Sequence, residues 1–368
     1  MKFRCERDVV ADAFGAASRA ATGRATNPTL SCLRLVLAGS QLRITGTDGD
    51  LTIEAAVEVA GGSDGVVLIP AKLASEVVRS LPSGAVEIET SGDKVLISAG
   101  RVNFSVPTGA EGDFPKWTGS VGSGVSVPAA EFAEALKQVV RAASTDDARG
   151  VLTGVLVTSV DGVLRLVATD SYRLAIRDIA ASVLPDGSRF VVPARALNEL
   201  QRLLGGAETV SIDITDNDAT FTIGSTRLVT RLISGTFADY QRLIPPSPPN
   251  TLLVSRDALI ESIRRVKLVA RDPIGTPLKV RMSTDGVTLR MVSQDSGEAV
   301  ENIEADLKGN EIEMSFNNEL LAAGIDACPT DIVSIQTSEP GKLAVIRPVI
   351  DGDSKKANYT YLLMPLRA

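Results

Sequence analysis

The sequence contains no histidine among its 368 residues. This absence excludes the Ser-His-Asp and Cys-His arrangements of nucleophilic catalysis, the HExxH metalloprotease motif and the commonest zinc sites. A phosphate-binding loop is also missing, because Gly341-Lys342 lacks both the preceding glycine and the following hydroxyl residue of GxxxxGK[ST]. We therefore expect no catalytic residue, no metal and no cofactor, and an enzyme of unrecognised type is the weaker interpretation.

Long hydrophobic runs are lacking too. No apolar run approaches the ~18 residues of a membrane span, and the segment that begins at Met1 has no signal-peptide hydrophobic region. The cysteines are odd in number and have no metal-ligand spacing, which fits reduced thiols at Cys5, Cys32 and Cys328. Together these features predict a cytoplasmic globular protein.

A repeat organises the chain. The pair Thr169-Asp170 recurs as Thr47-Asp48 and as Gln294-Asp295, at spacings of 122 and 125 residues. Helical patterns open at a similar spacing, at Pro70, Pro193 and Phe316. A fixed period of this size indicates tandem domains. We predict three of them, at residues 1–120, 126–246 and 251–368, joined by a small-residue linker at 118–126 and a proline-rich linker at 244–251.

Hydrophobic periodicity predicts the content of each repeat. Apolar residues at helical spacing predict a helix over residues 5–20, with Val9, Ala13 and Ala17 inward. A second helix from Pro70 has an inward face formed by Leu73, Val77 and Leu81. Apolar alternation broken by glycine predicts short antiparallel strands after each helix. The predicted fold class is therefore α+β, with three domains that each pack two helices on antiparallel sheets.

The equivalent residues Asp48, Asp170 and Asp295 could form a carboxylate cluster. Because they occupy one position in three separate domains, we expect them to lie far apart. We favour a structural role in which each carboxylate caps a turn between strands.

Charge leaves two interpretations open. The formal net charge of −7 argues by itself against a nucleic-acid partner. However, the predicted helices and the turn at Arg24 carry a small basic excess, whereas the predicted strands and loops are acidic. The basic residues form either an ordinary solvated helix face or a layer that faces phosphates.

Three segments carry a family resemblance: Ala168-Thr-Asp-Ser-Tyr-Arg-Leu-Ala175, Gly235-Thr-Phe-Ala-Asp-Tyr-Gln-Arg-Leu-Ile-Pro245 and Leu362-Leu-Met-Pro-Leu-Arg367. With the tandem repeat, they resemble the bacterial beta sliding clamp of the replicative DNA polymerase over essentially the whole chain. The resemblance implies a homodimer in which two chains close head to tail into a six-domain ring, with helices lining the hole and sheets outside. Such a ring is a processivity factor and not an enzyme.

The resemblance further implies that the ring encircles duplex DNA. A closed ring needs only weak, sequence-independent phosphate contacts, because tight binding would stop it from sliding. The residues at DNA-facing positions are Arg24, Lys72, Arg79, Arg149, Arg195 and Arg202.

An apolar cleft between the second and third domains is also implied. It would bind a short peptide carried by the polymerase, the clamp loader and repair proteins, and its aliphatic groups and methionine suit a leucine or phenylalanine anchor. The matching residues are Leu152, Thr169, Ser171, Tyr172, Arg173, Leu174, Ala238, Arg242, Leu243, Leu320, Ile346, Pro348, Met364, Pro365, Leu366 and Arg367.

Three residues depart from the family pattern: Tyr172 replaces a frequent histidine, Ala238 the usual proline and Ala368 a terminal leucine. They leave open an alternative, a specialised second clamp copy that tolerates a clamp-directed inhibitor.

Ring closure needs two different, complementary edges. The resemblance implies that Arg101, Phe104 and Val106 of the first domain meet third-domain residues of the partner, namely Leu268, Val269, Glu298 and Glu304. An apolar centre surrounded by opposite charges fits an interface core with a charged rim.

Overall fold

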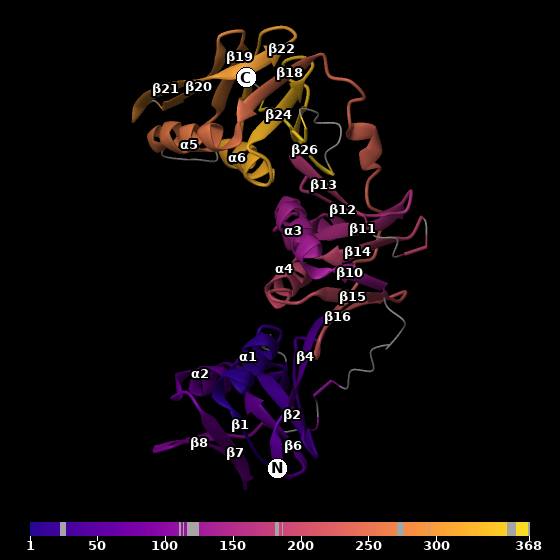
Figure 1. The fold of residues 1–368 in the computed structure, drawn as a ribbon, viewed down its shortest axis with the longest axis vertical. Coiled ribbons are helices and arrows are strands. Elements are labelled where there is room, and N and C mark those ends of the chain that lie inside the picture. The colour runs from indigo at the N-terminus through magenta and orange to yellow at the C-terminus, as the bar shows by residue number, and fades with distance from the viewer. Residues whose placement is uncertain are drawn as a thin grey trace. The chain divides into compact units, whose positions relative to one another are not determined.

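The computed structural model describes residues 1–22, 27–109, 112, 114–115, 125–180, 184–185, 187–270, 276–293, 295–351 and 358–366. Contacts divide the chain into two compact units, residues 1–131 with 195–232 and residues 132–194 with 233–368. All strand pairs in the described residues are antiparallel, and helices accompany them (Figure 1). The predicted α+β class is confirmed.

The first unit contains two sheets. The five-stranded sheet has the order β5 (Ala60–Ser63), β1 (Lys2–Glu6), β7 (Ala85–Ser91), β8 (Lys94–Ala99) and β9 (Val102–Pro107). The eight-stranded sheet has the order β10 (Val125–Pro128), β15 (Thr209–Ile214), β16 (Asp218–Ile223), β17 (Thr226–Arg231), β4 (Leu51–Glu58), β3 (Gln41–Thr47), β2 (Cys32–Ala38) and β6 (Gly65–Pro70). Its helices are α1 (Arg7–Ser18), α2 (Ala71–Ser80) and most of α4 (Ala194–Leu203), with a 3₁₀ turn at Pro28–Ser31.

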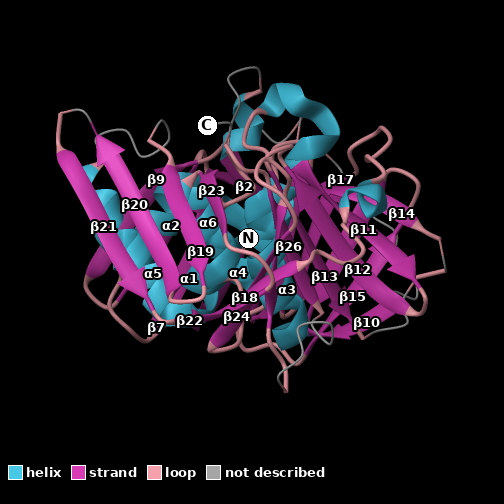
Figure 2. Ribbon diagram, turned by 90° about the horizontal axis from the view of Figure 1, so that it is seen from above, coloured by secondary structure: helices cyan, strands magenta, loops and turns pink. Residues whose placement is uncertain are grey.

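The second unit also contains two sheets. Nine strands run in the order β14 (Arg189–Pro193), β11 (Gly154–Val160), β12 (Val163–Thr169), β13 (Arg173–Ile179), β26 (Tyr359–Leu363), β25 (Ala344–Pro348), β24 (Ile332–Thr337), β18 (Asn250–Ser255) and β22 (Ala305–Lys308). The four-stranded sheet, whose strands lie side by side in Figure 2, has the order β21 (Gly297–Ile303), β20 (Gly286–Ser293), β19 (Leu278–Ser283) and β23 (Ile312–Phe316).

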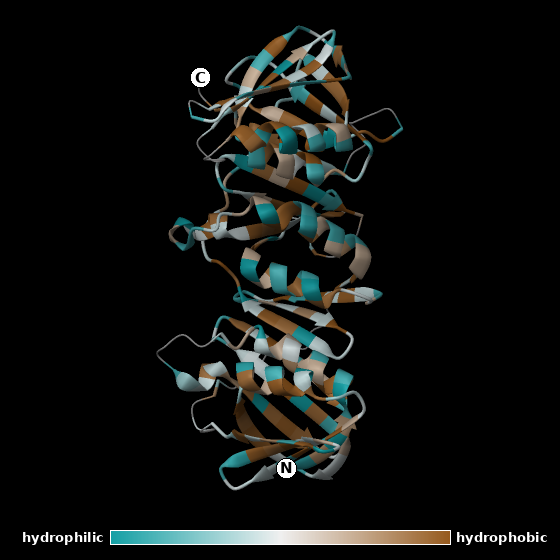
Figure 3. Cartoon of the chain, turned by 90° about the vertical axis from the view of Figure 1, so that its left-hand side faces the viewer, coloured by the Kyte–Doolittle hydropathy of each residue, from teal (hydrophilic) through white to brown (hydrophobic). Residues whose placement is uncertain are grey.

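The helices of this unit are most of α3 (Ala129–Val139), α5 (Arg256–Val266) and α6 (Asn318–Asp326). Short 3₁₀ turns lie at Val140–Ala142, Asp147–Thr153, Tyr240–Leu243 and Lys267–Val269. Helices of both units carry hydrophilic and hydrophobic residues together (Figure 3), as expected for elements with one buried face.

Two predicted helix faces are wrong by part of a turn. Val9 of α1 and Leu73 of α2 were expected inward and are exposed. Each was chosen as the first member of an i, i+4, i+8 row, and such a row winds about 40° per step around the helix. The buried stripes instead add the adjoining i+3 positions, as in Val10, Phe14 and Ala17 of α1.

Sheets continue across the repeat boundaries. In the first unit, β17 of the second repeat pairs with β4 of the first, with Leu228 opposite Ile53. In the second unit, β26 of the third repeat pairs with β13 of the second, with Tyr361 opposite Ala175. Backbone hydrogen bonds therefore join successive repeats, in addition to the linkers. Of the linker predicted at 118–126, all but the last two residues lie outside the described residues.

Candidate functional site

The repeated Thr-Asp pair forms the same turn twice. In both Thr47-Asp48 and Thr169-Asp170, the threonine hydroxyl accepts from the amide two residues on and donates to the carbonyl four residues on. The aspartate Oδ1 accepts from the amides two and three residues on, at 2.8 to 3.1 Å. The predicted capping role is confirmed for these two copies, while Gln294 of the third lies outside the described residues. The described residues contain no group of three or more acidic, cysteine or histidine side chains that could hold a metal ion.

Asp48 also links two repeats within the first unit. Its Oδ2 lies 2.6 Å from Nη1 of Arg195, whose Nη2 donates to the Thr22 hydroxyl at 3.2 Å. Burial disfavours the charged carboxylate, but the amide of Leu51 and the charge of Arg195 outweigh it and lower the pKa of Asp48. Arg195, which was predicted to face DNA, therefore also joins the two repeats through its contacts with Asp48 and Thr22.

Two other predicted DNA-facing cations line a cavity of the first unit. Lys72 and Arg79 border a space of 770 Å³ between α1 and α2, together with Arg19, which was not among the predicted contacts. Neither Lys72 nor Arg79 has an ion-pair partner among the described residues, so both charges are available to a phosphate. Arg202 bonds to Glu199 at 2.9 Å. Arg24 lies outside the described residues.

Arg149 has a different setting. Its Nη1 donates to the carbonyl of Asp170 at 2.6 Å and its Nη2 to the hydroxyl of Ser171 at 2.8 Å. The guanidinium thus braces the turn that ends β12. Sequence reasoning had grouped Arg149 with the DNA-facing cations and missed this contact, because its partner lies 21 residues along the chain.

Strand pairing brings together the predicted cleft residues of two repeats. Leu174 of β13 lies opposite Leu362 of β26, and the amide of Met364 donates to the carbonyl of Tyr172 at 2.9 Å. Leu174 and Leu362 belong to one buried cluster with Phe237, Tyr240 and Val345. The phenol of Tyr361 donates to the carbonyl of Leu320 at 2.9 Å, which fixes the start of α6 against β26.

Exposure divides the predicted cleft residues into buried, half-buried and exposed groups. Thr169, Leu174, Ile346 and Pro348 are buried, and Leu152, Arg173, Leu320, Pro365 and Leu366 are half-buried. The exposed members are Ser171, Tyr172, Ala238, Arg242, Leu243 and Met364. Tyr172 is 62% and Met364 45% exposed, so two large apolar side chains from adjoining backbone stay open to solvent. Arg242 pairs with Asp239 at 2.8 Å, and Arg367 lies outside the described residues.

The residues predicted to close a ring lie on unpaired sheet edges or beside one. Strand β9 ends the five-stranded sheet and β21 ends the four-stranded sheet. On β9, Val106 is buried whereas Phe104 remains 37% exposed. Beyond α5, Leu268 is 84% exposed and Val269 half-buried. Glu298 of β21 bonds to Arg290 at 2.5 Å, while Arg101 and Glu304 are exposed and have no ionic partner in the described part of the chain.

The thiols are poorly suited to chemistry. Cys32 and Cys328 are buried and Cys5 is half-buried, and all three are free. Burial raises the pKa of Cys5 to about 11 and that of Cys328 to about 12. The reactive thiolate is therefore scarce at neutral pH.

Comparison with known proteins defines the class. Models of the N-terminal, central and C-terminal domains of the DNA polymerase III beta subunit match residues 1–118, 126–239 and 241–367. The chain therefore belongs to the DNA polymerase III beta-subunit family, the beta sliding clamps. No helix of the described residues is long and apolar enough to cross a membrane.

Individual relatives cover the chain from end to end. The beta sliding clamp of Streptomyces coelicolor is 30% identical, over 100% of this chain and 99% of the relative. A beta sliding clamp homolog of Streptomyces muensis, GriR, is 29% identical with the same coverage. The sliding clamp of Pseudomonas aeruginosa, solved bound to griselimycin, superposes with a TM-score of 0.92 at 26% identity and covers 100% of both chains.

We predict that Asp48→Asn destabilises the protein by about 1 kcal/mol at neutral pH, because the charge of the pair with Arg195 is lost. The folded pKa of Asp48 is depressed, so its stabilisation is present above the unfolded pKa, about 4, and disappears as the pH falls through the lower folded value. Urea denaturation from pH 7 to pH 3 should show the difference shrink below about pH 4.

Asp216→Asn is the matched control, since this exposed carboxylate has no ionic partner in the described ranges. A wild-type minus Asp48→Asn difference that stays constant over the whole pH range would contradict the assignment.

Proposed function

We propose that the protein is a DNA polymerase processivity factor, a head-to-tail dimeric ring that encircles duplex DNA and slides along it. It acts in the cytoplasm without catalysis. Membership of the sliding-clamp family supports a role in DNA replication. The observation that carries the ring is that β9 of the first repeat and β21 of the third each end a sheet, with no strand paired on the outer side.

Repeat equivalence supports the pairing of these two edges. Strand β9 follows a two-residue turn that places Ala99 opposite Val102, and β17 follows the same turn with Ile223 opposite Thr226. Strand β21 follows Asp295 as β4 follows Asp48. Strand β9 thus corresponds to β17, and β21 corresponds to β4. Because β17 pairs with β4 inside the chain, β9 of one copy is proposed to pair with β21 of another. Two such contacts close a ring of two chains.

Burial supports the same conclusion. Counted from the hairpin turn, Phe104 corresponds to Leu228. Leu228 is fully buried against the neighbouring repeat, whereas Phe104 is 37% exposed. An aromatic side chain at a sheet edge contributes most when a partner covers it. Leu268 and Val269, beside β21, supply apolar surface of matching character.

DNA contacts in this proposal are weak and non-specific. The unpaired charges of Lys72 and Arg79 suit phosphate oxygens, and retention comes from topology and not from affinity. Arg24, Arg149, Arg195 and Arg202 remain proposed contacts. Arg149 also holds the turn that carries Ser171, a residue of the proposed cleft.

Partner proteins are proposed to bind at the cleft. The exposed side chains of Tyr172 and Met364 offer an apolar contact surface with an adaptable thioether, above the buried Leu174 and Ile346. The replicative polymerase, the clamp loader and repair proteins would each insert a leucine or phenylalanine anchor there.

A specialised second clamp copy is the alternative. The exposed Tyr172, at a position where the family often has histidine, favours it. Titration with griselimycin separates the two roles: binding much weaker than that of the Pseudomonas aeruginosa clamp favours the specialised copy, and equal binding removes its support.

We expect topological retention on DNA. The protein is loaded by a bacterial clamp loader onto nicked circular plasmid, free protein is removed by gel filtration, and half the sample is linearised. The protein should stay on circles and leave linear molecules, because only a ring is released at an end. Immediate loss from both, with a control clamp loading normally, counts against the ring.

Met364→Ala should weaken peptide binding about tenfold, as expected when a buried anchor loses an apolar contact. Fluorescence polarisation with a peptide from the clamp-binding segment of a bacterial replicative polymerase measures the effect. Val292→Ala is the control, since Val292 of β20 is similarly exposed, at 49%, outside the cleft. Equal losses in both variants would remove the cleft assignment.

Phe104→Arg should convert the dimer into a monomer, because a charge would be buried at the apolar centre of the interface. Sedimentation velocity measures the mass. Leu96→Arg is the control: Leu96 is exposed on the other face of the same sheet, since its neighbour Ile97 is the residue opposite Phe104. A dimer-sized mass for Phe104→Arg would overturn the interface.

A further inference from the structure

Ser171 has a backbone conformation that serine rarely adopts. Its φ is 77°, in the left-handed region where a side chain is crowded. Apart from glycines, the other described residues with positive φ are Asp161 and Asp351, and aspartate accepts this region because its short side chain bonds to nearby backbone. Strain of this kind persists only where the surroundings hold it, and it is concentrated at functional sites. Here it falls on a residue of the proposed peptide cleft.

The turn itself does not need a serine at this position. In the first repeat, the Thr47-Asp48 turn makes the same hydrogen bonds as the Thr169-Asp170 turn, and Gly49 stands in place of Ser171 with a φ of 97°. Glycine adopts positive φ without a steric penalty. A glycine at position 171 would therefore form the turn more easily, and the reason for a serine lies outside the turn.

The hydroxyl of Ser171 accepts a hydrogen bond from a distant arginine. Nη2 of Arg149 donates to Oγ of Ser171 at 2.8 Å, and Nη1 donates to the carbonyl of Asp170 at 2.6 Å. Two parallel contacts orient a planar guanidinium, whereas a single contact leaves it free to rotate. The serine side chain thus supplies one of the two contacts that fix the orientation of Arg149.

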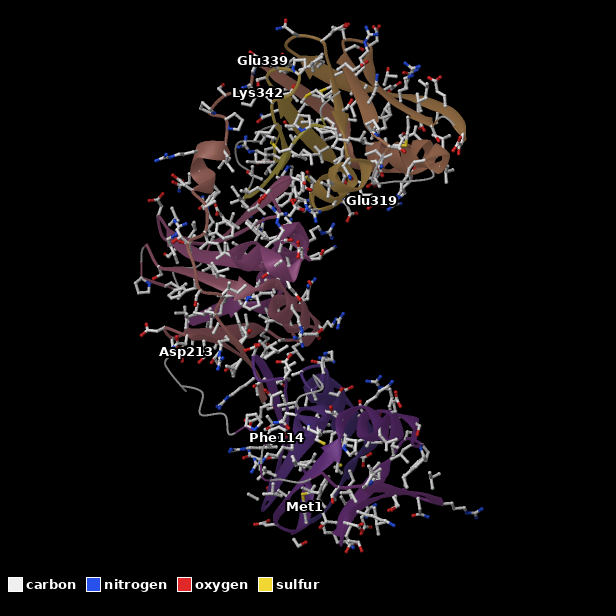
Figure 4. The ribbon with its side chains drawn as sticks, turned by 180° about the vertical axis from the view of Figure 1, so that it is seen from behind. Met1, Phe114, Asp213, Glu319, Glu339 and Lys342 are labelled. Atoms are coloured by element: carbon white, nitrogen blue, oxygen red, sulfur yellow. The ribbon has the colours of Figure 1, made fainter. Side chains whose placement is uncertain are left out.

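Charge does not hold Arg149 in place. Carboxylates that adjoin predicted cleft residues in the chain are already paired: Asp170 with Arg173 at 2.9 Å, Asp239 with Arg242 at 2.8 Å, and Glu319, labelled in Figure 4, with Lys267 at 2.8 Å. Arg149 has no carboxylate partner in the described part of the chain. Its orientation depends on two neutral acceptors, a backbone carbonyl and the hydroxyl of Ser171.

The segment that carries Arg149 is fixed at its backbone. The amide of Arg149 donates to the carbonyl of Asp146 at 3.0 Å, and Oδ1 of Asp146 accepts from the amide of Ala148 at 3.0 Å. Farther along, a Cβ at Gly235 would lie 2.8 Å from Cγ1 of Val151, so the two segments pack closely. What remains adjustable is the long side chain of Arg149, which loses rotamer freedom when it is held.

We propose that Ser171 is a positioning residue of the peptide cleft: its hydroxyl, presented on a strained turn, fixes the guanidinium of Arg149 against the turn that carries Tyr172. The inference rests on the proposed peptide-binding function and deepens it. Because Arg149 is already ordered in the free protein, less conformational entropy is lost when a partner binds, and the affinity rises. The strain at Ser171 keeps the hydroxyl in place for this contact, which the counterpart turn at Gly49 lacks.

Fluorescence polarisation with a peptide from the clamp-binding segment of a bacterial replicative polymerase tests the role. The assay contains no DNA, so the proposed DNA contact of Arg149 does not enter. Ser171→Gly should raise the peptide Kd about three- to tenfold, because Arg149 loses its side-chain acceptor. Arg149→Met should raise it at least as much. The double variant should bind no worse than Arg149→Met alone, because Ser171 acts through Arg149.

A conservative variant and a control accompany these measurements. Asparagine adopts positive φ readily, and its side-chain oxygen can accept from Arg149. Ser171→Asn should therefore recover most of the affinity that Ser171→Gly loses. Arg281→Met, which removes an exposed guanidinium from β19, is the control and should leave the peptide Kd unchanged.

Urea denaturation separates positioning from structural support. Since Gly49 forms the same turn, Ser171→Gly should unfold at a urea midpoint no lower than that of the wild type. The positioning role is wrong, and the cleft stands, if Ser171→Gly binds within about twofold of the wild type, if its loss of affinity comes with a matching loss of stability, or if Ser171→Asn binds as weakly as Ser171→Gly. A wild-type protein that does not bind the peptide overturns the cleft and the positioning role together.

Discussion

Backbone pairing between successive repeats is the constraint on which the structure depends. A sheet edge exposes a row of unsatisfied N–H and C=O groups, which proteins must cover or pair. Here β4 is covered by β17 and β13 by β26, so each repeat satisfies an edge of the one before it. In the first repeat β9, the counterpart of β17, ends its sheet without such a partner among the described strands, and in the third repeat so does β21, the counterpart of β4. The proposed ring pairs β9 of one copy with β21 of another, as β17 pairs with β4 and β26 with β13 inside the chain.

The proposed peptide cleft depends on the same pairing. The register of β13 against β26 sets Leu174 opposite Leu362 and leads directly to the bond between Met364 and Tyr172. The Thr169-Asp170 turn then fixes where β13 begins. Arg149, which lies 21 residues earlier in the chain, donates a hydrogen bond to the carbonyl of Asp170 in that turn. The relative positions of these predicted cleft residues therefore follow from the strand register and from the turn that Arg149 holds.

The sequence predicted features that depend on neighbouring residues and missed those that depend on distant ones. The Asp48 and Asp170 caps were predictable because donor and acceptor lie within three residues. The family motifs predict the cleft residues, and the cleft stays a prediction. The exposure of Val9 was missed because one helical row does not define a stripe. The contact of Arg149 with the Asp170 turn was not predicted, and no periodicity reveals that β17 pairs with β4, because strand partners are chosen by tertiary geometry.

The helices show how the proposed closing contact differs from the internal ones. The thirteenth residue from the start of α1 is Arg19, which pairs with Glu199 of the next repeat at 3.0 Å. Its counterpart after α3 is Arg141, which pairs with Asp326 at 3.1 Å. After α5 the same position is Leu268, 84% exposed. Ion pairs thus support the two junctions within the chain, and an apolar residue occupies the equivalent position at the proposed closing junction. Apolar contact is non-directional and little screened by salt, so a seam centred on Leu268 can part and re-form without a fixed ionic geometry, while charges at its rim select the correct edge.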